Sequence, residues 1–182
     1  MNFDSASSDY ISIGTIDSLN TSQNFSISLW FNENLRKSTG TLFSSGTGNG
    51  NLISVSSRNG VLNIYVGNSG YTPITSVSLN TWHHVVLTVE NTTAKVYINN
   101  GSPTTNTVGS INSSSGNLAK IGDLSFASGY YFDGQIDEVA IWNTALTSTQ
   151  IAEIYNGTGT NTTKDLTTVS GSNLKYWNRM GD

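Results

Sequence analysis

The segment 131–147 constrains the fold of this chain more than any other part of the sequence. It reads YFDGQIDEVAIWNTALT, an apolar run between a turn that contains glycine and a threonine that can begin a helix. Ile136, Trp142 and either Val139 or Ala140 are expected to fill a core against the first strand of the chain. A core strand followed directly by a short helix is therefore predicted here.

Three other segments have distinctive sequences and occur in a fixed order: NFDSASSDYISIG at 2–14, FSISLWF at 25–31 and WHHVV at 82–86. Together with 131–147, they resemble strands of laminin-G-like and pentraxin-like modules of the concanavalin A-like lectin/glucanase superfamily. The resemblance covers residues 2 to about 157. It implies an all-β fold, a two-sheet antiparallel jelly-roll sandwich, in a family that usually binds glycans or protein surfaces.

Alternation of apolar and polar residues with a period of two supports an all-β fold on separate grounds. Phe25, Ile27, Leu29 and Phe31 share one face of a predicted strand, and serines occupy most of the other face. Tight turns between strands need residues that accept a positive φ, such as Asn and Gly. Strands joined by such turns should pair as antiparallel neighbours. The predicted strands are 41–45, 51–57, 61–66, 84–90 and 94–98, and the turns include Arg58-Asn59-Gly60 and Asn99-Asn100-Gly101.

One short helix is predicted directly after the strand of segment 131–147. Thr147 and Gln150 have the spacing of a capping box, in which each side chain bonds to the backbone amide of the other residue. Ile151 and Ile154 follow at helical spacing and would give the helix one apolar face. We therefore expect a helix over residues 148–156.

The jelly-roll domain is expected to span residues 1–157. Residues 158–182 are rich in Thr, Ser, Gly and Asn, which indicates a terminal strand or a linker toward a following module. The last nine residues, LKYWNRMGD, resemble a phrase found at boundaries between laminin-G-like modules in large phage and marine viral structural proteins. This resemblance implies one module of a longer adhesive protein, at an extracellular or virion surface.

Composition excludes several classes of partner. Only 11% of the residues are charged and the net charge is -4, whereas binding to a phosphate backbone needs clustered Lys and Arg. We therefore expect no nucleic-acid partner. No apolar run approaches the length of a membrane span, so no membrane insertion is expected. The chain has no cysteine, which excludes disulfides and thiolate metal sites.

Enzyme activity is not expected either. Retaining glycosidases need two carboxylates roughly 5 Å apart on either side of the scissile bond. Asp137 and Glu138 are consecutive, and consecutive residues of a strand point to opposite faces. His83 and His84 diverge for the same reason. We therefore interpret the two histidines as structural residues of a strand and not as metal ligands or catalytic groups.

One structural calcium ion is the only cofactor considered. Calcium takes six to eight oxygen ligands, which loops at the rim of a sandwich can supply. The resemblance to laminin-G-like modules implies one such ion, whereas the loop 45–51 lacks the carboxylate that the two-ion pentraxin site requires. Two interpretations stay open: the acids bind calcium, or they accept hydrogen bonds from backbone amides at turns. The candidate ligands are Asp4, Asp9, Asp133 and Asp137.

Sugar recognition requires exposed aromatic rings beside short polar side chains. The loops 68–72 and 123–131 have this composition, and Tyr71 and Tyr130 are the preferred rings. Trp30 lies on the polar face of its strand and is a third candidate, unless the predicted helix covers it. The candidate carbohydrate-binding residues are Tyr71, Tyr130, Asn68, Asp123, Asn49 and Trp30.

The leading functional interpretation is a non-catalytic, lectin-like adhesion module that binds glycans or host cell-surface polysaccharide. The alternative is a structural module that packs against neighbouring modules or subunits and binds no free glycan. The two interpretations differ in one structural respect. A lectin should expose Tyr71 and Tyr130 around a concave surface, whereas a packing module should bury them in an interface.

Overall fold

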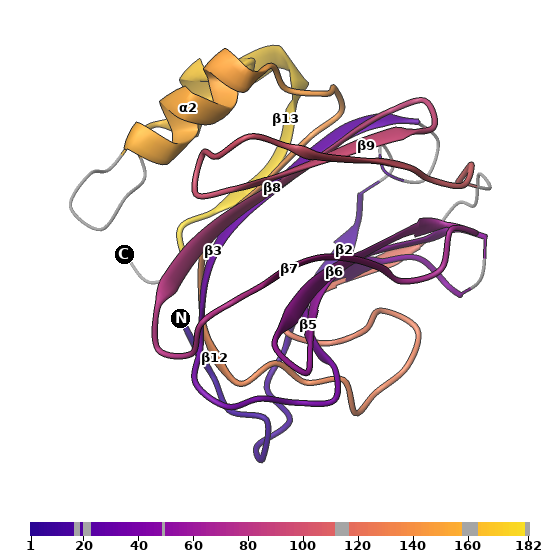
Figure 1. Cartoon of the computed structure of the whole chain (residues 1–182), viewed down its shortest axis with the longest axis vertical. Helices are drawn as coiled ribbons and strands as arrows, with labels where there is room; N and C mark the ends of the chain where they lie inside the picture. Colours follow the sequence, from indigo (N-terminus) through magenta and orange to yellow (C-terminus); the bar gives the residue numbers. More distant parts are fainter. Residues whose placement is uncertain (17–18, 20–22, 49, 112–116, 158–163, 181–182) are drawn as a thin grey trace.

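Two antiparallel β-sheets lie face to face in the computed structural model, and one helix covers the outer face of the larger sheet (Figure 1). This arrangement confirms the predicted all-β sandwich. The structure describes residues 1–16, 19, 23–48, 50–111, 117–157 and 164–180. No helix within these residues is long and apolar enough to cross a membrane.

The larger sheet has seven strands and contains the strand predicted from the segment 131–147. This strand, β12, pairs with both β1 and β3, and Asn2 lies opposite Gln135 in the register. The first strand of the chain therefore pairs with a strand that lies more than a hundred residues later in the sequence. In order of pairing the strands are β1 (Asn2–Phe3), β12 (Gly134–Trp142), β3 (Asn24–Glu33), β8 (Trp82–Glu90), β9 (Thr93–Ile98) and β10 (Thr104–Thr107), and β13 (Leu174–Asn178) also pairs with β12.

The smaller sheet has six strands, most of them joined by short turns to their neighbours in the sequence. The turn between β5 and β6 has positive φ angles of 48° at Asn59 and 80° at Gly60, as predicted. In the turn after β9, positive φ falls on Asn99 and Asn100 and not on Gly101. In order of pairing the strands are β2 (Ile11–Thr15), β11 (Leu118–Ile121), β4 (Gly40–Ser45), β5 (Leu52–Arg58), β6 (Val61–Gly67) and β7 (Thr72–Ser76).

The helix α2 (Ser148–Gly157) creates a second apolar core on the outer face of the seven-stranded sheet. Ile151 and Ile154 pack there with the fully buried Trp142 of β12. Two 3-10 turns, Leu166–Thr168 and Gly171–Asn173, lead from the helix to β13. The indole Nε1 of Trp142 donates a hydrogen bond to the Val169 carbonyl at 2.8 Å, which ties this C-terminal segment to the sheet.

The predicted capping box is present at the start of α2. The Thr147 amide donates to Gln150 Oε1 at 2.9 Å, and the Gln150 amide donates to Thr147 Oγ1 at 3.3 Å. Thr147→Ala is expected to lower the free energy of unfolding by about 1 kcal/mol, because one amide of the first turn loses its acceptor. Urea denaturation measures the change. Thr149→Ala, at an exposed position of the same turn, is the control and should leave the midpoint nearly unchanged; an equal loss in both variants would contradict a specific cap.

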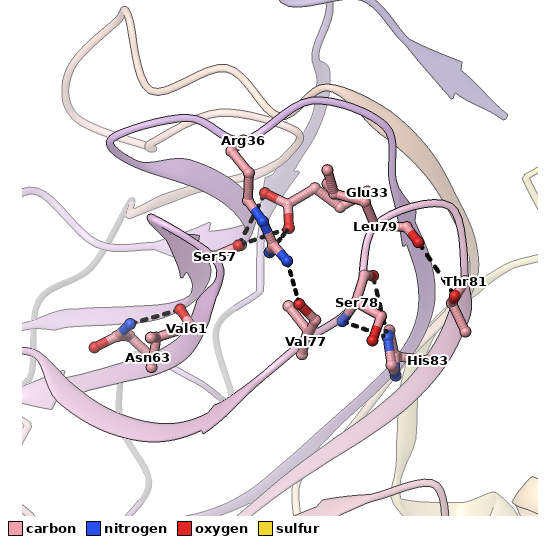
Figure 2. A network of polar contacts seen from close by, with 10 residues as sticks. All are labelled: Glu33, Arg36, Ser57, Val61, Asn63, Val77, Ser78, Leu79, Thr81 and His83. Atoms are coloured by element: carbon pink, nitrogen blue, oxygen red, sulfur yellow. Dashed lines mark hydrogen bonds and ion pairs between the residues drawn. The ribbon is translucent and has the colours of Figure 1, made fainter.

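A partly buried ion pair, with a buried carboxylate, lies between the two sheets at one end of the sandwich (Figure 2). Glu33, on β3, has a side chain that is only 1% exposed, and its Oε2 accepts a hydrogen bond from Arg36 Nη1 at 2.8 Å. Ser57, on β5 of the other sheet, donates to Glu33 Oε1 at 2.9 Å. The guanidinium also donates to the Val77 carbonyl and lies against Gly60, where a Cβ atom would collide with it. One carboxylate thus links three parts of the chain.

A β-bulge overturns the prediction that Asp137 and Glu138 point to opposite faces. Glu138 has a φ of 49°, and the pairing of β12 with β3 is interrupted after Asp137. Ile136 and Val139 both belong to the sandwich core, so the two acids between them lie outside it. Glu138 Oε2 accepts a hydrogen bond from Trp177 Nε1 on β13 at 2.7 Å. The bulge therefore provides an anchor for β13.

Candidate functional site

The outer face of the six-stranded sheet is lined by hydroxyl and amide groups. In the register, Ser44 lies beside Ser54, and Thr41 lies beside Ser56. The residues between them, such as Val55, point into the sandwich core, so the polar side chains share the opposite face. We call this surface the polar face. It comprises Thr41, Ser44, Ser54, Ser56, Asn63, Tyr65 and Lys120.

Three hydroxyl groups of the polar face are buried without a partner. Thr41, Ser54 and Ser56 are each at most 1% exposed. Within the described part of the chain, no hydrogen bond reaches Thr41 Oγ1, Ser54 Oγ or Ser56 Oγ. Buried polar groups in proteins are nearly always paired, and an unpaired group needs an explanation. These hydroxyls are covered in this structure, so a ligand that carries its own hydroxyl groups can bond to them only when the side chains above them move aside.

Aromatic rings stand beside these hydroxyls. Tyr65, on β6, lies opposite Ser54 in the register and meets the ring of Tyr71 edge to face, with 5.2 Å between centroids. The Arg58 guanidinium lies over the Tyr71 ring, with Cζ 3.9 Å from its centroid. Burial raises the pKa of Tyr71; Arg58 opposes this rise, and the neighbouring phenols of Tyr130 and Tyr65 add to it. Tyr65, Tyr71 and Arg58 therefore form one cluster, and Tyr130 is near enough to affect the Tyr71 phenol.

Tyr130 reaches this cluster from the loop between β11 and β12, and it is the most exposed of the rings at 38%. Its carbonyl accepts a hydrogen bond from the Thr41 amide at 2.8 Å, which holds the loop against β4. Asp123 is fully buried and accepts hydrogen bonds from the Tyr130 amide and from Lys120 Nζ, each at 3.2 Å. Asp123 therefore positions the loop, and its carboxylate has no exposed surface for a ligand.

Two other candidate binding residues, Trp30 and Asn68, have surroundings of their own. Trp30 is on the seven-stranded sheet and stacks on Tyr155 of α2, with 5.4 Å between centroids, as the alternative interpretation foresaw. Asn68 is exposed in the turn between β6 and β7, where its backbone lies against Gly109. Asn49 lies outside the described residues. The structure thus brings Tyr71, Tyr130 and Asp123 together and places Trp30 on the other sheet.

Tyr65, Arg58 and the hydroxyls of the polar face were missed as candidates. A signal for them exists in the sequence. Ser54 and Ser56 alternate with the core residues Ile53 and Val55, and Tyr65 alternates with core residues in the next strand. Two adjacent strands that carry serines and a tyrosine on the solvent side predict a polar surface with an aromatic edge.

The calcium candidates fall into two groups. Asp4, Asp9 and Asp133 surround the turn that follows β1, and Asp137 lies in the bulge of β12. Every one of these carboxylates accepts a backbone amide hydrogen bond, for example Asp4 Oδ1 from Ala6 at 2.8 Å. No three His, Cys, Asp or Glu side chains of the described residues converge as a metal site. The carboxylates as placed do not supply the six to eight oxygen ligands that calcium takes. Calcium binding stays an untested prediction.

The two histidines diverge, as predicted. His84 is fully buried under α2, where a hydrogen bond joins its Nε2 to Ser28 Oγ at 2.8 Å and burial lowers its pKa to about 3. His83 points toward the loop before β8, and its Nε2 lies 3.3 Å from the Ser78 carbonyl oxygen (Figure 2). Neither histidine lies near the polar face. Both therefore serve the packing of the seven-stranded sheet.

Two hollows of about 310 Å³ each lie away from the polar face. One is beside the start of α2, and its described lining includes Tyr97, which is only 8% exposed. The other lies between β7 and β9 and has no Tyr, Trp or Phe among its described lining residues. Because sugars dock on exposed rings, the polar face is the better candidate for a carbohydrate site.

Comparison with protein families agrees with this fold. Residues 4–152 match a laminin G family described as concanavalin A-like lectin/glucanases superfamily. The chain belongs to this superfamily. The resemblance inferred from the four sequence segments is therefore correct. None of the curated proteins compared with the chain matches it.

Solved structures with the same fold include a domain of an enzyme, a pentraxin and a putative carbohydrate-binding protein. Domain 4 of AbnA, an extracellular GH43 arabinanase from Geobacillus stearothermophilus in complex with arabinotriose, is 24% identical, with a TM-score of 0.67 over 79% of this chain and 72% of that one. A heptameric SAP-like pentraxin from Limulus polyphemus is 22% identical, with a TM-score of 0.62 over 76% and 72%. A putative carbohydrate-binding protein from Bacteroides ovatus is 18% identical, with a TM-score of 0.74 over 100% of this chain and 51% of that one. Superfamily membership alone does not decide between catalysis and binding.

Proposed function

We propose that this domain binds carbohydrate on the polar face of its six-stranded sheet, without catalysis. The observation that carries the proposal is the set of three buried, unpaired hydroxyls of Thr41, Ser54 and Ser56 beside the tyrosine cluster. A sugar ring stacked on Tyr130 would remove apolar area from water, and its hydroxyls would bond to these groups once the side chains that cover them move aside. Structural relatives described as carbohydrate-binding, or solved with arabinotriose, support this choice.

The absence of catalysis is part of the proposal. Asp123 is the carboxylate that contacts the loop of this site, and both of its oxygens already accept hydrogen bonds. A glycosidase needs a second free carboxylate across the scissile bond.

The larger context is also proposed: the domain would serve adhesion to glycans or cell-surface polysaccharide, as part of an extracellular or virion-surface protein. The rival proposal, a packing module, is favoured by the exposure of Phe126 at 47% on the same loop.

Tyr130→Ala is expected to weaken glycan binding by about 1–3 kcal/mol and to leave the melting temperature nearly unchanged, because the ring is exposed and would carry the stacking energy. A glycan array identifies a ligand, and calorimetry with that ligand measures the loss. Phe126→Ala is the matched control, since it removes another exposed ring from the same loop. Equal losses in both variants, or no bound glycan on the array, would sink the proposal.

Ser54→Ala tests the hydroxyls separately. Removing a buried hydroxyl that has no partner should leave the stability unchanged or raise it, whereas removing a ligand contact should weaken binding. The expected result is therefore weaker glycan binding by a protein that is at least as stable. A large loss of stability would instead show that the Ser54 hydroxyl serves the fold.

A further inference from the structure

Arg58 is an arginine without a carboxylate partner at the centre of the proposed site. The chain has three arginines. Arg36 pairs with Glu33 at 2.8 Å, and Arg179 lies 3.5 Å from Glu138. In the described part of the chain, no acid lies within ion-pair distance of Arg58. In a protein with 12 acidic and 8 basic residues, this leaves one uncompensated positive charge beside the tyrosines.

The geometry of Arg58 leaves part of its guanidinium available. Its Nε donates to Thr39 Oγ1 at 3.2 Å, and its Cζ lies over the Tyr71 ring. Among the described residues, no acceptor bonds to Nη1 or Nη2, which carry four of its five N–H donors. Stacking and one hydrogen bond hold the side chain in place, so little conformational freedom is lost when the free donors bind a ligand.

The other cation of the polar face does not share this property. Lys120 pairs with the buried carboxylate of Asp123 at 3.2 Å, and its ammonium lies 4.5 Å from the centroid of the Tyr10 ring. This pair is close to neutral. The net charge that a ligand meets at the tyrosine cluster therefore comes from Arg58.

We propose that the site prefers glycans that carry a carboxylate, such as uronic or sialic acids, and that Arg58 binds this carboxylate. The inference rests on the proposed function and narrows its substrate class. A guanidinium matches a carboxylate with two parallel hydrogen bonds. The sugar ring would then contact Tyr130 and its hydroxyls would face Thr41, Ser54 and Ser56. A neutral sugar would leave the Arg58 charge partly desolvated without a partner, which disfavours it.

The test is a glycan array that carries neutral and carboxylated glycans, followed by calorimetry with each bound glycan and its methyl ester. Methyl esterification removes the charge and keeps the hydroxyls. We expect esterification to weaken binding about 10- to 100-fold, as for a lost charge-assisted hydrogen bond. Arg58→Gln should lose this preference, while Arg58→Lys should keep part of it because the charge remains. Melting curves of both variants confirm that they fold.

The outcomes separate the two proposals. Binding of neutral glycans that Tyr130→Ala weakens and Arg58→Gln does not would overturn the carboxylate preference and leave carbohydrate binding intact. Bound acidic glycans whose methyl esters bind equally well would overturn it too. No binding of any glycan by the folded protein would overturn the proposed function itself.

Discussion

Arg36→Met is expected to lower the free energy of unfolding by about 3 kcal/mol, because it leaves the Glu33 carboxylate buried without its partner. This value is at the low end for a broken buried ion pair, since the Arg36 side chain is 35% exposed while Glu33 is 1% exposed. Urea denaturation at neutral pH measures the change. The double variant Arg36→Met/Glu33→Gln should recover much of the loss, since it removes the stranded charge. A single variant as stable as the parent would contradict the role assigned to this pair.

The pH dependence of stability tests the same carboxylate. Burial raises the pKa of Glu33 above its ordinary value of 4.5, despite the opposing effects of Ser57 and Arg36. The folded protein therefore holds this proton more tightly than the unfolded chain. The stabilising contribution is fully present below pH 4.5 and is lost as the pH rises through the folded-state pKa. Glu33→Gln lacks this titration, so the stability of the parent relative to the variant should fall over that range; a constant difference between the two proteins would refute the raised pKa.

The strands that could be predicted from the sequence are those with strong alternation. β5, β6 and β8 lie within two residues of the predicted 51–57, 61–66 and 84–90, because each buries one apolar face in the sandwich. β7, β10 and β11 were not predicted. They contain four or five residues, too few to show a clear alternation, and they form by pairing with longer neighbours. Short strands of this kind depend on their neighbours more than on a sequence pattern of their own.

The site could be predicted only in part, for a related reason. Composition correctly drew attention to the loops that carry Tyr71 and Tyr130, but these residues are 59 positions apart and only the fold brings them together. Sequence could not show that Asp123 is buried, because that depends on how Lys120 and the loop fold back on it. Likewise, alternation fails at Glu138, where a bulge changes the direction of the side chain.

Deleting residues 158–182 is expected to abolish cooperative folding. If this segment were a linker, as one sequence interpretation allows, its removal would be harmless. In the structure, Leu166 and Val169 are at most 1% exposed in the second core, and β13 pairs with β12 from Val139 to Trp142. The deletion would expose Trp142 and an edge of β12, at a cost of more than about 5 kcal/mol, which is comparable to the whole stability of a domain.

Two substitutions in this segment separate lost packing from lost length. Val169→Asp places a charge in the second core, beside the fully buried Trp142, whose indole donates to the Val169 carbonyl. The substitution should lower the melting temperature strongly. Ser172→Asp adds the same charge at an exposed position three residues later and should have little effect. Thermal unfolding followed by circular dichroism compares both variants with the deletion. If residues 1–157 alone melt cooperatively near the temperature of the parent, and Val169→Asp does as well, the domain ends at residue 157 and the C-terminal segment is an accessory to it.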